Sequence, residues 1–189
     1  MATPGDEHEI ELVPLSVSTM TALVSGDLDT ARAESGAELS TYFLDEAWLW
    51  RIRLAQVEQD PTVLDWIARA AVDAQSGQVV GHVGFHGPPD YRGMVEVAYA
   101  VDPAYRRRGY ATAMLRRALA WAAAEPSVHF VRASISPDNG ASLATLQPFG
   151  FRPVGEQWDE EDGLELLFER PAQDDEGPVT QQSQELQEP

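Results

Sequence analysis

Residues 101–112, VDPAYRRRGYAT, lie between a predicted strand and a predicted long helix. The stretch follows an alternating segment, Met94–Val101, that is typical of a strand, and from Gly109 onward apolar residues recur at helical spacing. A strand, a tight loop and a helix N-terminus together bind phosphate, because the first helical amides lack internal partners and the helix dipole is positive there. Gly109 has no Cβ, so its backbone can approach an anion closely. The stretch therefore predicts an anion site at the start of a long helix.

Three arginines, Arg106, Arg107 and Arg108, precede this glycine and supply charges that can pair with phosphate oxygens. Arginines before a helix can also form only a solvated cluster. The stretch is not a Walker loop, because it lacks the Gly-Lys-Ser/Thr ending, and it is not a GxGxxG dinucleotide turn. Its position directly after a strand with one bare face favours the anion site.

The predicted strand Met94–Val101 has two unlike faces. The bulky face carries Val95, Val97, Tyr99 and Val101, and the other carries Glu96, Ala98 and Ala100. We expect the bulky face to pack against the rest of the protein. The other face is nearly bare except for one carboxylate.

Changes of hydrophobic period place the remaining elements. Strands are predicted at Glu9–Val13, Leu64–Val72, Val79–Phe85, Val128–Ile135, Pro153–Trp158 and Leu164–Arg170, the last two as a closing hairpin. Helices are predicted at Leu15–Leu23, Thr30–Ser35, Asp45–Gln59, from Gly109 to Glu125, and at Asn139–Leu146 with Asp138 or Asn139 as its cap. Trp48 and Trp50 in the third helix either line a substrate pocket or pack in the core. This order predicts an α/β (α+β) fold, a mixed sheet with helices on both faces.

Length and composition limit the domain organisation and the partners. The 189 residues suffice for one domain, with a flexible N-terminus at 1–8, the domain at 9–170 and an acidic, Gln-rich disordered tail at 171–189. The net charge of −18 argues against nucleic acid, whose phosphates would be repelled, and indicates a solvated acidic surface before a cationic substrate. The sequence leaves a homodimer open.

The chain contains no cysteine, which excludes disulfides, thiolate metal sites and a cysteine nucleophile and fits a reducing cytoplasm. No apolar run approaches the roughly 20 residues of a membrane span, and the polar first residues disfavour a secretory signal. We therefore expect a cytoplasmic protein with neither a membrane segment nor a metal.

Residues 106–111, RRRGYA, resemble the R-x-x-G-x-G/A pyrophosphate loop of the GNAT superfamily of N-acetyltransferases, with Ala111 in the last small position. Downstream, the segment from Ser136 to Asn139 and the pair Gly150-Phe151 resemble the second signature of that family. Ser142, three residues after Asn139, is similar to the branch that contains ribosomal-protein N-terminal acetyltransferases and their small-molecule relatives. The resemblance covers roughly residues 9–170.

The resemblance implies a mostly antiparallel central sheet, split between the parallel strands Met94–Val101 and Val128–Ile135, with acetyl-CoA as cosubstrate in the gap. Asn139 would contact the cofactor near its thioester. The pantetheine arm would bond to the backbone of one strand, and the diphosphate would lie on the loop; these cofactor-binding residues are Tyr99, Ala100, Val101, Arg106, Arg107, Arg108, Gly109, Tyr110, Ala111 and Thr112. The acetyl group would pass directly to a primary amine of a small molecule or of a protein N-terminus.

Direct transfer needs a base that takes a proton from the ammonium form of the acceptor. Glu96 lies about where a subset of the family keeps its catalytic glutamate; the alternatives are a substrate-ammonium anchor and an exposed strand carboxylate. Glu156 and Glu160, near the closing hairpin, are rivals. His82 and His86 lie on the adjacent strand and face the same way, but a lone strand histidine is usually structural.

The chain departs from many relatives at the general acid. The family often has a tyrosine seven residues after the asparagine, where this chain has Leu146, so Ser142 or a bound water is expected to protonate the leaving thiolate. A serine in the first turn of a helix is also ordinary capping chemistry. The missing tyrosine motivates a second hypothesis, a non-catalytic acyl-CoA sensor or interaction module. Transfer of an acyl group longer than acetyl is a third, and would depend on how the Trp-rich helix closes the pocket.

Overall fold

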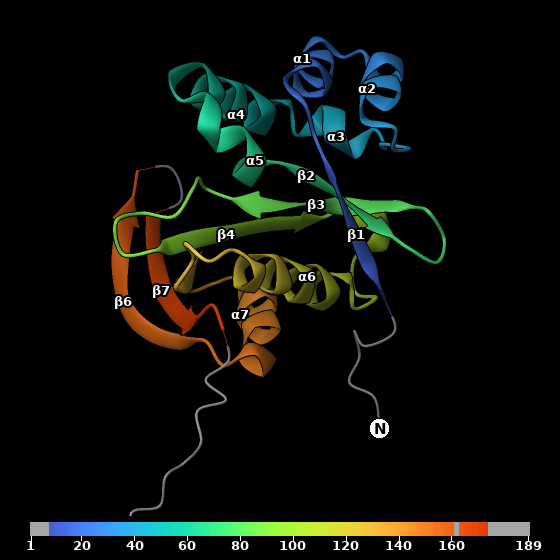
Figure 1. The fold of residues 1–189 in the computed structure, drawn as a ribbon. Coiled ribbons are helices and arrows are strands. Elements are labelled where there is room, and N and C mark those ends of the chain that lie inside the picture. Colours follow the sequence, from blue (N-terminus) through green and yellow to red (C-terminus); the bar gives the residue numbers. More distant parts are fainter. Residues whose placement is uncertain (1–7, 161–162, 174–189) are drawn as a thin grey trace, which may run out of the picture.

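The computed structural model describes residues 8–160 and 163–173. Its strands are β1 (Ile10–Pro14), β2 (Arg69–Asp73), β3 (Val79–Phe85), β4 (Met94–Val101), β5 (Phe130–Ile135), β6 (Arg152–Asp159) and β7 (Gly163–Pro171). They form one seven-stranded sheet in the order β1-β2-β3-β4-β5-β7-β6 (Figure 1). Every neighbouring pair is antiparallel except β4 and β5, which run parallel. The predicted mixed sheet and its closing hairpin are confirmed.

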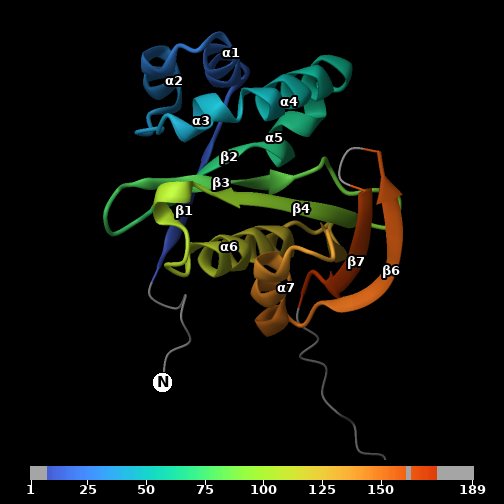
Figure 2. The ribbon, with the colours of Figure 1, turned by 180° about the vertical axis from the view of Figure 1, so that it is seen from behind.

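Helices cover both faces of this sheet, as predicted (Figures 1 and 2). The helices are α1 (Val17–Ser25), α2 (Leu28–Ser35), α3 (Tyr42–Asp45), α4 (Ala47–Gln59), α5 (Leu64–Ile67), α6 (Tyr110–Ala124) and α7 (Gly140–Leu146), with 3-10 turns at Pro61–Val63, Pro103–Tyr105 and Gln147–Phe149. Helices α1 to α5 lie over one face, and α6 and α7 lie over the other. Each layer buries its own apolar cluster against the sheet, as the burial of Trp50 on one side and Met114 on the other shows.

The strand predicted at Leu64–Val72 is wrong in its first half. Asp60 accepts a hydrogen bond from the Thr62 N–H at 2.9 Å and so starts a helical turn at Pro61, which continues through α5. Only from Arg69 does the chain pair as β2. The cap at Asp60 and the burial of Ile67 therefore favour a helical turn here, although the residues of Leu64–Val72 alternate as in a strand. Helix α5 packs so closely on β3 that a Cβ at Gly84 would lie 2.5 Å from the Ile67 carbonyl oxygen.

The parallel pair β4 and β5 is unusually short. Only three register pairs join the strands, from Met94 opposite Phe130 to Glu96 opposite Arg132. Beyond Glu96 the two strands diverge, and their later residues line a cavity together. The fold therefore opens the sheet in its middle, between α6 and α7 on one side and α4 on the other.

Within the described ranges, 8–160 and 163–173, no helix combines the length and apolar character that crossing a bilayer requires. Most of the N-terminal segment 1–8 and of the tail 171–189, for which flexibility and disorder are predicted, lies outside those ranges, as do residues 161 and 162, which follow Glu160.

Candidate active site

The loop between β4 and α6 is held in a strained conformation. Asp102 accepts hydrogen bonds from the Ala104 N–H at 2.9 Å and from Ser40 Oγ at 2.6 Å, which fixes the turn after β4. Arg107 has a φ of 60° and Gly109 a φ of 88°, and Arg107 is the only non-glycine among the described residues with a positive φ. Strained backbone of this kind persists where the surrounding structure holds it, often at functional sites.

A cavity of about 550 Å³ lies against this loop. The residues that line it come from β4, the loop, the first turn of α6, and α7 with its cap: Tyr99, Ala100, Val101, Tyr105, Arg106, Arg107, Gly109, Tyr110, Ala111, Thr112, Asn139, Ala141, Ser142 and Thr145. The first amides of α6 have no acceptor within their own helix and so are available to an anion. Of the residues predicted from sequence for the loop, only Arg108 does not line this cavity.

Arg108 and the side chain of Tyr110 instead contribute to a cluster behind the loop. Asp73 accepts hydrogen bonds from the Tyr110 hydroxyl and from His8 Nδ1, each at 3.1 Å. His8 stacks on Tyr110 with a centroid distance of 4.0 Å, and its Nε2 lies 2.9 Å from the Arg108 carbonyl oxygen. Burial and the bond to Asp73 raise the pKa of Tyr110. The cluster ties the start of α6 to β2 and so fixes the direction of its first amides.

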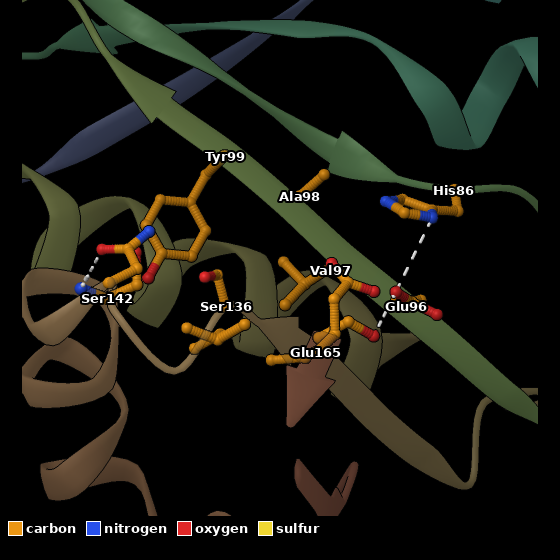
Figure 3. Close-up of a pocket in the computed structure, with 12 residues that line it drawn as sticks. His86, Glu96, Val97, Ala98, Tyr99, Ser136, Ser142 and Glu165 are labelled. Carbon is orange, nitrogen blue, oxygen red and sulfur yellow. Dashed lines mark hydrogen bonds and ion pairs between the residues drawn. The ribbon is translucent and has the colours of Figure 1, made fainter. Parts of the chain in front are cut away.

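A second cavity, of about 450 Å³, lies where β4 and β5 diverge (Figure 3). Glu96 is its central carboxylate: Oε1 accepts a hydrogen bond from Ser134 Oγ at 2.6 Å and lies 3.7 Å from His86 Nδ1. The Glu96 side chain is 18% exposed, whereas that of His86 is 56% exposed. Glu165 of β7, which sequence reasoning missed, also lines this cavity and accepts from Gln157 Nε2 at 2.9 Å.

Tyr99 lines both cavities, at the place where they meet. Its hydroxyl oxygen is buried and has no hydrogen-bond partner among the described residues. Burial raises the pKa of Tyr99, and the hydroxyls of Thr145 and Ser142 on α7 oppose that rise only in part. Figure 3 shows the ring pointing from β4 toward Ser142. The sequence assigned this side chain to a packing face, and a phenol between two valines was the only signal of another role.

The start of α7 also faces the cavities. Asn139 is the cap of this helix, since its Oδ1 accepts from the Ser142 N–H at 3.1 Å. Ser142 and Asn139 line both cavities. Leu146, at the position where many relatives have tyrosine, is 3% exposed and belongs to the core.

The rival acids lie elsewhere. Glu156 and Glu160 are exposed on the closing hairpin and line neither cavity. His82 is 8% exposed, with its ring against Tyr42 and Trp50, so it is a largely buried group beneath α4.

A third cavity, of about 380 Å³, lies beneath α4 and shares His86, Ala98 and Tyr99 with the cavity of Glu96. Trp48 and Trp50 both line it, although Trp50 is 1% exposed and packs in the core while Trp48 is 55% exposed. Both tryptophans therefore line a pocket, and Trp50 packs in the core as well. Tyr99 is common to the linings of all three cavities, so the cavities at the loop, at Glu96 and beneath α4 adjoin one another.

Residues 11–152 match the family model described as "Acetyltransferase (GNAT) domain". An uncharacterized N-acetyltransferase of Bacillus subtilis, YjdG, is 35% identical over 74 residues, which are 39% of this chain and 44% of that protein. The matched stretch thus spans less than half the length of this relative.

Several solved structures share the fold at low sequence identity. The ribosomal-protein-S5-alanine acetyltransferase of Vibrio fischeri is 18% identical with a TM-score of 0.57, over 87% of this chain and 93% of that one. Mycobacterium smegmatis RimJ, in complex with CoA-disulfide, is 19% identical with a TM-score of 0.59, over 86% and 82%. A chimera of spermidine N-acetyltransferase SpeG from Vibrio cholerae and hSSAT is 16% identical with a TM-score of 0.59, over 87% and 96%.

Proposed function

Because this chain belongs to the GNAT acetyltransferase family, we propose that it transfers the acetyl group of acetyl-CoA directly to a primary amine of a small molecule or of a protein N-terminus. One observation carries the proposal: the start of α6 and the carboxylate of Glu96 line adjoining cavities that share Tyr99. A donor held by the loop and an acceptor held near Glu96 would therefore meet in the gap between β4 and β5.

The residues around the loop fit acetyl-CoA. The first amides of α6 and the charges of Arg106 and Arg107 would hold the diphosphate. The backbone of β4 from Val97 onward has no partner in β5, so it would bond to the pantetheine arm as to an added strand. Asn139 and Ser142, at the start of α7, would face the arm from the other side. Acetyl-CoA supplies the activated acyl group when bound.

Glu96 is the proposed general base. Its carboxylate lies at the cavity with 18% of the side chain exposed, so an ammonium group can reach it. Ser134 donates a hydrogen bond to Oε1 and orients the carboxylate, leaving Oε2 for the acceptor. A carboxylate in this position would first attract the ammonium form and then take its proton, which leaves a neutral amine as the nucleophile.

Tyr99 is the proposed proton donor to the leaving thiolate, a role for which Ser142 is the alternative. The phenol oxygen makes no hydrogen bond of normal geometry among the described residues, although the Thr145 and Ser142 hydroxyls are close enough to oppose the rise in its pKa. A phenol is protonated at neutral pH, and burial raises the pKa of Tyr99 further. An unpartnered buried hydroxyl is costly, and a ligand that accepts its hydrogen bond would remove that cost. Tyr99 would thus supply from β4 the hydroxyl that Leu146 cannot supply from α7.

Tyr99→Phe is expected to lower kcat by about 10- to 100-fold, because the ring still fills its space but the proton donor is lost. The affinity for acetyl-CoA should change by no more than about threefold, a difference of about 0.7 kcal/mol. Steady-state kinetics and calorimetry measure the two quantities separately. Ser142→Ala is the matched comparison, since it removes the other hydroxyl that lines both cavities. Should Ser142→Ala lose the larger share of kcat, the donor is the serine.

The second candidate function, a non-catalytic acyl-CoA sensor, is favoured by Leu146, which lacks any ionisable group at the usual position of the acid. The two functions differ in one observable, which is release of free thiol from acetyl-CoA in the presence of an amine. A panel of primary amines and short peptides should yield thiol release with at least one acceptor. Binding of acetyl-CoA with no release across the whole panel would instead support the sensor.

A further inference from the structure

Arg53 of α4 is a buried cation, 6% exposed. Its Nη1 donates to Gln56 Oε1 at 2.9 Å, and its Nε has no partner among the described residues. No carboxylate of the described residues lies within ion-pair distance of it. Burial lowers the pKa of Arg53 to about 10, so the guanidinium still carries its charge at neutral pH. A buried charge of this kind is costly unless an anion meets it.

Arg53 lines the cavity beneath α4, which adjoins the cavity of Glu96. Gln56 connects the two: it accepts from Arg53 and donates from Nε2 to the His86 carbonyl oxygen at 3.0 Å. The His86 ring in turn faces Glu96 across 3.7 Å. An acceptor whose amine lies at Glu96 would therefore extend past His86 toward the guanidinium.

The other charges in these cavities leave Arg53 as the cation available to a ligand. Glu46 faces His82 across 3.8 Å, and that neighbour lowers the pKa of the Glu46 carboxyl, which is thus ionised. Glu96 accepts from Ser134 and faces His86. The cavity of Glu96 and the cavity beneath α4 therefore offer carboxylates for an ammonium group and one guanidinium for an anion. Trp48 and Ile52, which are 55% and 43% exposed, add apolar surface between them.

We propose that the acceptor carries a carboxylate besides its amine, and that Arg53 binds this carboxylate. The inference rests on the proposed function and narrows its substrate class to zwitterionic amines with an apolar body. The net charge of −18 is compatible with such an acceptor, because a zwitterion has no net charge to be repelled. A polyamine would be attracted by the overall charge but would place a cation beside Arg53.

The carboxylate could belong to a free amino acid or to an acidic residue near a peptide N-terminus, and matched acceptor pairs distinguish the two sources. Phenylalanine against phenethylamine tests the first, and peptides that begin Ala-Glu against Ala-Gln test the second. In the wild-type protein, kcat/KM for the carboxylated member of at least one pair should be about 10- to 100-fold higher, the usual worth of a charged hydrogen bond. Arg53→Gln should abolish that ratio, and Arg53→Lys should keep part of it.

A readout without turnover separates failure of this inference from failure of the proposed function. N-acetylphenylalanine and N-acetyl-Ala-Glu, which keep the carboxylate, should raise the Tm of the wild-type protein but not of Arg53→Gln. Arg53→Gln should itself unfold at an equal or higher temperature than wild type, because it removes an unpaired buried charge. Turnover of amines with no preference for either carboxylated acceptor overturns the inference while leaving the acetyltransferase intact. A large loss of stability in both Arg53 variants, with all acceptors affected equally, overturns it also.

Discussion

Gly109→Glu is expected to weaken binding of acetyl-CoA by at least about 100-fold, or about 2.7 kcal/mol. Gly109 has a φ of 88°, which a residue with a Cβ adopts only at a cost of about 1 kcal/mol or more. The new carboxylate would also stand at the N-terminus of α6, where it would occupy the amides and repel the diphosphate. Isothermal calorimetry with acetyl-CoA measures the effect directly.

Gly26→Glu is the matched control for this change. Gly26 has a similar φ of 80°, is exposed at the end of α1, and lies on the opposite face of the sheet from α6. The Gly26→Glu variant therefore carries the same backbone strain and the same added charge as Gly109→Glu without touching the loop. The affinity of this variant for acetyl-CoA should equal that of the wild-type protein. Unchanged affinity in Gly109→Glu would count decisively against the loop as the cofactor site.

Glu96→Gln should lower kcat by about 100- to 10,000-fold at neutral pH, the range over which a general base contributes. The affinity for acetyl-CoA should stay unchanged, because Glu96 lines the cavity between β4 and β5 and not the cavity at the loop. The loss should shrink as the pH rises toward the pKa of the acceptor, about 8 for an α-amino group and about 10 for a lysine-like amine. A deprotonated amine needs no base, so solution chemistry then replaces the carboxylate.

Glu156→Gln provides the comparison, since it makes the same substitution at an exposed residue of β6 that lines neither cavity. Its kcat and its pH profile should match those of the wild-type protein. If Glu96→Gln instead raised KM for the amine and left kcat intact at every pH, Glu96 would be an anchor for the ammonium group and another group would be the base.

Much of the fold could be predicted because its signals are local. The apolar run of β3, the alternation of residues in β4 and the helical spacing in α6 each lie within one short window, and the structure reproduces their bounds almost to the residue. The failure at Leu64–Ile67 is local too. A four-residue turn is too short to show a helical period, so the alternation at Trp66 and Ala68 indicated a strand.

The contents of the candidate site were harder to predict, because they depend on contacts between distant residues. Tyr99 was assigned to a packing face and to backbone contacts with the cofactor, whereas its buried hydroxyl, without a hydrogen-bond partner among the described residues, is seen only in the folded protein. Nothing in the sequence distinguishes Arg53 from the other charged residues of its helix, yet the packing of α4 over the sheet buries it. His8 lies 100 residues from the Arg108 carbonyl that its ring meets. A contact between residues so far apart cannot be predicted from local spacing in the sequence.

The short pairing of β4 with β5 bears on whether other chains can pair with the sheet. β4 and β5 diverge after three register pairs, so the backbone N–H and C=O groups beyond that point have no partner in the other strand. Exposed strand edges of this kind usually pair with strands of other molecules. Here both edges face each other inside one sheet, with α6 and α7 over them, so another chain cannot easily reach them. The backbone groups that would bind an extended ligand are therefore also the strand edges of the gap that are protected from pairing with other chains.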